Sequence, residues 1–126
     1  MTFKFGKASE TNRRGVDQRL IEISDLALQI TPIDFGIPAL GGVRSFEDQK
    51  NLVKDGKSKT LNSKHLTGQA LDFYAFVDGE ASWNECHLAM IGASMLQAAN
   101  LLGYKIKWGG LWKNFKDYPH IELVGL

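Results

Sequence analysis

The chain has little cysteine, little net charge and no long apolar run, and each shortage excludes a class of protein. Cys86 is the only cysteine in 126 residues, so no disulfide can form within the chain. A net charge of +1 at pH 7 gives no long-range attraction toward nucleic acid or an anionic membrane. No segment approaches the roughly 20 apolar residues of a membrane span, and the N-terminal residues do not form a signal peptide. We therefore expect synthesis in the cytosol, no nucleic-acid partner and no integral membrane segment.

Length and composition predict one ordinary globular domain. Hydrophobic residues make up 44% of the chain and charged residues 23%, values typical of a globular protein. A chain of 126 residues buries roughly two-thirds of its unfolded surface, so we expect a single domain over residues 1–126. Cys86 lies inside a helical pattern and is expected to be a buried structural residue, with a thiol nucleophile as the alternative. The lysine-rich stretch 54–64 favours a solvated loop, with attraction to an acidic polymer as the alternative.

Apolar periodicity and capping residues predict the α+β fold class. Residues 1–14 are polar and are expected to run as an arm over the surface. Helices are expected over residues 16–30, 45–54 and 83–102, the last opened by a capping box at Ser82–Glu85 and ended by Gly103. Strands are expected over residues 35–40, 69–76, 104–108 and 119–123. This order of elements favours a small antiparallel sheet packed with helices.

Two histidines and one aspartate form the most informative pattern. His65 and Asp72 lie in SKHLTGQALD, and His120 lies in DYPHIEL. Two imidazoles and one carboxylate suit a single zinc ion and leave a fourth position open for water. A lone histidine is more often satisfied by an ordinary hydrogen bond, and a lone strand aspartate is commonly an edge residue. Together, the three residues predict a catalytic zinc site.

The expected strand 119–123 places two polar side chains on one face. Alternation puts His120 and Glu122 on one side and Ile121 and Leu123 on the other, toward the helices. Two carboxylates are therefore candidates for the proton acceptor of a hydrolase. On geometry alone Glu122 competes with Asp117, because Glu122 shares a strand face with His120.

These stretches also carry a family resemblance. SKHLTGQALD matches the pattern Ser-x-His-x-x-Gly-x-Ala-x-Asp of zinc peptidases that cut D-amino-acid bonds in peptidoglycan. DYPH matches the acidic residue that precedes a histidine in the same group. The chain resembles the VanY-like D-alanyl-D-alanine carboxypeptidases and L-alanyl-D-glutamate peptidases, and most of all the single-domain phage endolysins. The likeness covers nearly the whole chain and implies a hedgehog-like α+β fold with no separate wall-binding domain.

The resemblance implies a role for each matching residue. Three residues match the zinc ligands: His65, Asp72 and His120. Asp117 matches the acidic residue that takes a proton from water and returns it to the leaving amine. Arg44 matches an arginine that holds substrate or stabilises developing negative charge, and Ser63 matches a serine near the substrate. Without the resemblance, a surface ion pair with Glu47 or Asp48 would be an equally good interpretation of Arg44.

The aromatic loop WGGLWKNF leaves two questions open. Leu111 stands where related endolysins often carry a polar residue, commonly Asp, so the substrate contacts of this loop are in doubt. Trp108 and Trp112 either line a peptide groove or pack in the core. His87 lies on the long helix with no ligand one turn away, so we leave it outside the site.

The resemblance implies a phage or prophage endolysin that hydrolyses an amide of the peptidoglycan stem peptide, most directly the L-alanyl-D-glutamate bond. One alternative is a D-alanyl-D-alanine carboxypeptidase with the same zinc site. Another is a zinc-stabilised binding module without activity. We expect a monomer that remains in the host cytoplasm after synthesis and depends on a holin to reach the periplasm and cell wall.

Overall fold

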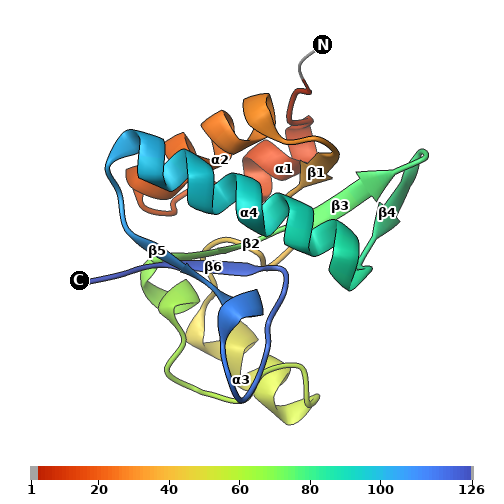
Figure 1. Ribbon diagram of the computed structural model, residues 1–126. Coiled ribbons are helices and arrows are strands. Elements are labelled where there is room, and N and C mark those ends of the chain that lie inside the picture. Colours follow the sequence, from red (N-terminus) through yellow and green to blue (C-terminus); the bar gives the residue numbers. More distant parts are fainter. Residues whose placement is uncertain (1–2, 126) are drawn as a thin grey trace.

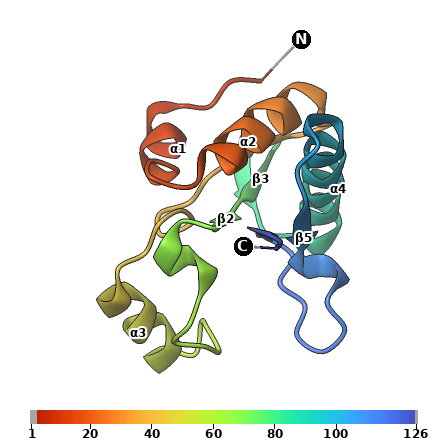
Figure 2. The same ribbon diagram turned by 90° about the vertical axis from the view of Figure 1, so that its left-hand side faces the viewer.

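The structure is a computed structural model that describes residues 3–125, and it confirms the α+β class (Figure 1). Helices α2 (Gln18–Ile30) and α4 (Glu85–Leu102) pack side by side on one side of the strands. The short helix α1 (Lys7–Asn12) lies next to α2. Helix α3 (Phe46–Lys54) lies on the far side of the strands (Figure 2). No helix within residues 3–125 is long and apolar enough to cross a bilayer.

The strands form two three-stranded antiparallel sheets rather than the single sheet that was predicted. One sheet has the order β1-β3-β4 and comprises Asp34–Gly36, Tyr74–Val77 and Glu80–Ser82. The other has the order β2-β6-β5 and comprises Ala70–Asp72, His120–Leu123 and Ile106–Trp108. Both sheets are antiparallel, as expected.

The predicted strand 69–76 is divided between these two sheets at Phe73. The Phe73 side chain is fully buried, and its backbone N–H donates to the carbonyl of Pro119 at 2.8 Å. The residues before Phe73 pair with β6, and the residues after it pair with β1 and β4. The division fixes Asp72 at the end of its strand, directly opposite His120.

The hydrophobic core lies between the α2–α4 pair and the strands. Buried side chains recur along α2 and α4 at the predicted helical spacing: Leu20, Ile23 and Ala27 on α2, and Leu88, Ile91 and Met95 on α4. From β6, Ile121 and Leu123 enter the same core, as the alternation predicted. His120 and Glu122 consequently face away from the α2–α4 layer.

The predicted arm over residues 1–14 is mostly exposed within its described part, residues 3–14, but Lys7–Asn12 are helical. They fold into α1, whose Ser9 is buried, and its hydroxyl accepts a hydrogen bond of 3.0 Å from the N–H of Ile37. Asn12 donates to the carbonyl of the same residue at 2.8 Å. Ser9 and Asn12 thus satisfy the backbone N–H and C=O of Ile37, the residue that follows β1. These bonds hold the polar helix α1 against the rest of the domain.

The helix starts agree with the sequence in one case and differ in another. The Ser45 hydroxyl accepts from the N–H of Asp48 at 3.0 Å and caps α3, as predicted. Helix α4 begins later than predicted, because Ser82 belongs to β4 and Asn84 caps the helix by accepting from the N–H of Cys86 at 2.8 Å. Cys86 is exposed in this first turn, so its predicted burial is wrong.

Asp17 begins α2 and ties the helix to the segment that carries His65. Its carboxylate accepts from the side chain of Arg19 at 2.8 Å and from the Arg19 N–H at 2.9 Å, and these bonds lower the pKa of Asp17 to about 2. Its own N–H donates to the carbonyl of Gly68 at 2.8 Å. The ionised Asp17 carboxylate therefore stabilises the folded protein, because its folded pKa lies below the ordinary value of 3.8. This contribution to the free energy of unfolding is complete above pH 3.8 and is lost as the pH falls toward about 2.

We expect Asp17→Ala to lower the free energy of unfolding by about 1 kcal/mol at pH 7, the usual effect of losing a helix cap. Urea denaturation measures this difference, which should shrink as the pH falls from 3.8 toward about 2. Asp17→Asn keeps a capping oxygen and should lose less. Equal stability of Asp17→Ala and the wild type at pH 7 would contradict the role of Asp17 as the stabilising cap of α2.

Candidate metal centre

Three predicted site residues converge at one end of the β2–β6 pair. Asp72 ends β2, His120 begins β6, and the two are cross-strand partners. The 3-10 helix η1 (Lys64–Thr67) delivers His65, which is buried. Gly68 ends η1 with a φ of 74°, a left-handed conformation that glycine adopts without strain. One ligand atom from each of the three residues lies within 4.8 Å of the other two.

The spacing of these atoms fits a tetrahedral zinc ion. His65 Nε2 lies 3.1 Å from Asp72 Oδ1 and 3.3 Å from His120 Nδ1. His120 Nδ1 lies 2.9 Å from the same Asp72 oxygen. Ligands bound at about 2.0–2.1 Å to a tetrahedral ion are roughly 3.3 Å apart, so the triangle needs little adjustment to hold zinc. The donor set of two nitrogens and one oxygen is also one that zinc accepts.

The outer nitrogen of each histidine has a partner that sets its orientation. His65 Nδ1 lies 2.8 Å from the carbonyl of Gly42, which can only accept, so Nδ1 carries the proton and Nε2 presents its lone pair. His120 Nε2 lies 2.9 Å from Glu122 Oε1, which leaves His120 Nδ1 for the centre. Such partners orient metal-binding histidines and raise their basicity. Glu122 is therefore engaged in orienting His120, and it also lies 3.4 Å from Lys64 Nζ.

Charges around the centre favour a cation. Burial by itself would raise the pKa of Asp72, but the two adjacent histidines hold it well below its usual range, so Asp72 is ionised. Burial lowers the pKa of His120, but hydrogen bonds with Asp72 and Glu122 outweigh this effect and raise the pKa to about 9. The carboxylates thus stabilise positive charge at this point, as a metal centre requires.

Asp117 lies beside the centre without belonging to the triangle. Its Oδ2 is 3.9 Å from His120 Nδ1, and its side chain is 36% exposed. Burial and the nearby charge of Asp72 raise the pKa of Asp117. The Asp117 backbone packs on Gly109, where an added Cβ would lie 2.2 Å from the Asp117 carbonyl oxygen. The loop after β5 therefore holds this carboxylate within reach of the centre.

Arg44 contacts a predicted metal ligand rather than an acid of α3. Its Nη2 donates to Asp72 Oδ2 at 2.9 Å, its Nε donates to the carbonyl of Leu40 at 2.7 Å, and its Nη1 donates to Gln49 Oε1 at 3.0 Å. The alternative of a surface ion pair with Glu47 or Asp48 is therefore wrong. The guanidinium fixes one oxygen of Asp72, so the other oxygen is directed toward the histidines.

We expect Arg44→Lys to weaken zinc binding by about 10- to 100-fold, because an ammonium group cannot reproduce the three fixed donations. Competition with a chromophoric zinc chelator measures the affinity. Arg19→Lys makes the same chemical change away from the centre and should leave the affinity unchanged. An Arg44→Lys protein with wild-type zinc affinity would contradict the role of this contact.

The centre lies in a cleft of about 620 Å³. Ser63 borders the cleft, and its hydroxyl accepts from the N–H of His65 at 3.1 Å. The two tryptophans separate: Trp112 lines the cleft with its ring 5.3 Å from that of His120, whereas Trp108 is buried and donates to a backbone carbonyl. Leu111 is 67% exposed and does not line the cleft.

Sequence reasoning missed Gln49 and Gly42 and left His87 outside the centre. His87 Nδ1 lies 2.7 Å from the Ser82 hydroxyl, away from the three clustered ligands. Gln49 is fully buried on α3. The sequence did carry a signal for the burial of Gln49, because this residue shares a helix face with the apolar residues three and four positions later, Leu52 and Val53.

Known proteins match this chain over most of its length. A family model described as phage L-alanyl-D-glutamate peptidase matches residues 1–124. The L-alanyl-D-glutamate peptidase of Escherichia phage T5 is 33% identical over 139 residues, covering 98% of this chain and 100% of that protein. The peptidoglycan L-alanyl-D-glutamate endopeptidase CwlK of Bacillus subtilis (strain 168) is 38% identical over 98 residues, covering 66% of this chain and 58% of that protein. The crystal structure of the Serratia marcescens L-Ala D-Glu endopeptidase ChiX matches with a TM-score of 0.86 and 38% identity, covering 96% of this chain and 90% of that one.

Proposed function

Because the chain belongs to the phage L-alanyl-D-glutamate peptidase family, as its motifs predicted, we propose that it is an endolysin with a single zinc ion. The reaction is hydrolysis of the amide between L-alanine and D-glutamate in the peptidoglycan stem peptide. His65, Asp72 and His120 are the zinc ligands. The observation that carries the proposal is their placement in the cleft, with ligand atoms at the spacing of a tetrahedral zinc site.

A zinc ion held by His65, Asp72 and His120 would supply a Lewis acid for the scissile carbonyl and for water. The chain supplies the proton transfers. Asp117 accepts a proton from the attacking water and delivers it to the leaving amine of D-glutamate. The raised pKa of Asp117 suits both steps. It makes the carboxylate a stronger base toward water, and it lets the carboxyl group hold the proton until the amine departs.

Other residues of the centre act by positioning. Glu122 and the carbonyl of Gly42 hold the two imidazole rings, which supports Asp117 over Glu122 as the proton acceptor. Arg44 holds Asp72 and lines the cleft, and the N–H groups of its guanidinium that make no other bond can donate to substrate. Ser63 stabilises the start of η1 and can still donate its hydroxyl proton to a substrate carbonyl.

We also propose that the enzyme acts as a monomer and reaches the wall from the host cytoplasm after a holin opens the membrane. The route is supported by the phage origin of the T5 peptidase, the relative that this chain matches over its whole length. Expression in bacteria with and without a holin tests it. Lysis should require the holin, and lysis at the same rate without one would contradict the route.

Digestion of purified peptidoglycan tests the proposed bond. After digestion with zinc-loaded protein, mass spectrometry should find new L-alanine carboxylates and new D-glutamate amines. Release of free D-alanine would instead identify the D-alanyl-D-alanine carboxypeptidase. No new termini at all would leave a zinc-stabilised binding module as the remaining function.

A further inference from the structure

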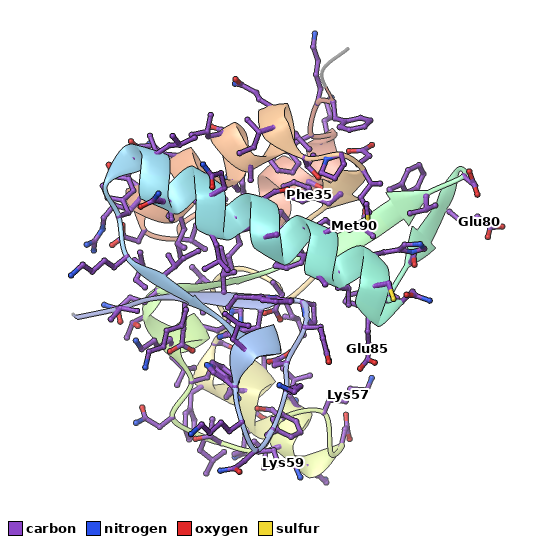
Figure 3. All side chains as sticks on the ribbon, in the orientation of Figure 1. Phe35, Lys57, Lys59, Glu80, Glu85 and Met90 are labelled. Carbon is purple, nitrogen blue, oxygen red and sulfur yellow. The ribbon has the colours of Figure 1, made fainter. Side chains whose placement is uncertain are left out.

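Two lysines in the loop between α3 and η1 line the cleft without a carboxylate partner. Lys57 and Lys59 border the cleft, and neither forms an ion pair within residues 3–125. Both lie on the lower part of the molecule in Figure 3, on the far side of the strands from α2 and α4. Lys59 Nζ lies 5.0 Å from the centre of the Phe115 ring, which also lines the cleft.

The acidic groups nearest the metal centre are engaged elsewhere. Asp72 contacts Arg44 and both histidines of the centre. Glu122 contacts His120 and Lys64. Asp117 also lines the cleft, and it forms no ion pair with Lys57 or Lys59 within residues 3–125. The four basic side chains of the lining outnumber the three acidic ones, and a metal ion would add positive charge. Such a cleft attracts an anionic ligand.

A buried glutamine holds the lysine loop in place relative to the metal centre. Gln49 is fully buried and accepts from Arg44 at 3.0 Å through its Oε1. Its Nε2 donates to the Ser58 hydroxyl at 2.8 Å and to the carbonyl of Thr60 at 2.7 Å. Arg44 in turn contacts Asp72. The residues on either side of Lys59 are thus tied to a metal ligand through two buried or half-buried side chains, so the loop presents its ammonium groups on a fixed support.

The substrate of the proposed reaction carries negative charge on one side of the scissile bond. D-Glutamate has two carboxyl groups, and only one of them can be used to continue the stem peptide. The other carboxyl is free and ionised at neutral pH. L-Alanine, on the other side of the bond, contributes no side-chain charge. A cation-lined wall therefore distinguishes the two directions in which the peptide can lie in the cleft.

We propose that Lys57 and Lys59 form the subsite for the free carboxylate on the D-glutamate side of the bond. This inference rests on the proposed function and deepens it, because it assigns the direction of the peptide and names its specificity-determining residues. In the complex, the free carboxylate of D-glutamate forms the ion pair that Lys57 and Lys59 lack in the protein alone. Gln49 acts as a positioning residue for the loop.

Steady-state kinetics on two peptides test the subsite. One peptide contains L-alanyl-D-glutamate with its free carboxylate, and the other has that carboxylate converted to a neutral amide. We expect the double variant Lys57→Gln/Lys59→Gln to raise KM for the acidic peptide by about tenfold, with kcat changed less than about twofold. For the amide peptide, the wild type and the double variant should have the same KM.

The matched control is Lys50→Gln/Lys54→Gln, which removes the same charge from α3 outside the cleft. This control should leave both KM values unchanged. A double variant of Lys57 and Lys59 with unchanged KM, or with KM raised equally for both peptides, would overturn the subsite while cleavage by the wild type continued to support the proposed function. Cleavage of neither peptide by zinc-loaded wild type would instead overturn the proposed function, and the subsite with it.

Discussion

Asp117→Ala is expected to lower kcat by about 10²- to 10⁴-fold, the usual contribution of a positioned proton acceptor. Zinc content should stay at one ion per chain, because Asp117 lies beside the three clustered ligands and is not one of them. The rate is measured as amine released from an L-alanyl-D-glutamate peptide, with zinc determined by atomic absorption on the same sample. Asp117→Asn should behave in the same way, since an amide of equal shape cannot accept the proton.

Glu122→Gln is the matched control for this prediction. A glutamine oxygen can still accept from His120 Nε2, which Glu122 contacts at 2.9 Å, so the ring stays in place. We expect activity to fall by about tenfold at most. A nearly normal Asp117→Ala enzyme together with an inactive Glu122→Gln enzyme would reverse the assignment of the two carboxylates.

His65→Ala is expected to abolish both zinc binding and activity. Its Nε2 is one of the three clustered atoms of the proposed zinc site, and the buried side chain lies between Asp72 and His120 at 3.1 and 3.3 Å. Loss of a group that merely orients a ligand weakens metal binding about 10- to 100-fold, and loss of the ligand itself should exceed that range. After dialysis, zinc should fall from one ion per chain to about one-tenth or less.

His87→Ala makes the same chemical change at a histidine outside the centre, where the ring contacts the Ser82 hydroxyl. This variant should keep its zinc and its activity. Circular dichroism shows whether His65→Ala remains folded, so that loss of metal can be separated from loss of structure. Retention of a full complement of zinc by folded His65→Ala would exclude this residue as a ligand.

The sequence predicted the features of the centre that depend on local patterns. The alternation in β6 placed Ile121 and Leu123 in the core and His120 on the opposite face. The Ser45 cap located the start of α3. Convergence of the three ligands did not follow from such patterns, because it depends on the pairing of strands that are distant in sequence. The motif resemblance supplied that information.

Features that depend on tertiary contacts were missed or predicted wrongly. The division of the strand at Phe73 follows from its two flanking segments having different partners, which no local periodicity encodes. The contact between Arg44 and Asp72 joins residues 28 positions apart, so local sequence alone made the nearby acids Glu47 and Asp48 equally good partners. In the N-terminal segment, Ser9 and Asn12 bond to the backbone of Ile37, 25 or more positions away, and the sequence gives no sign that these two polar residues are anchored rather than fully exposed.

Anomalous diffraction from crystals of the zinc-loaded protein, recorded on both sides of the zinc absorption edge, is the most direct test of a shared cation. We expect a single peak at about 2.0–2.2 Å from His65 Nε2, His120 Nδ1 and an oxygen of Asp72. A zinc peak elsewhere on the chain, or three ordered side chains with no peak between them, would contradict the proposed metal centre.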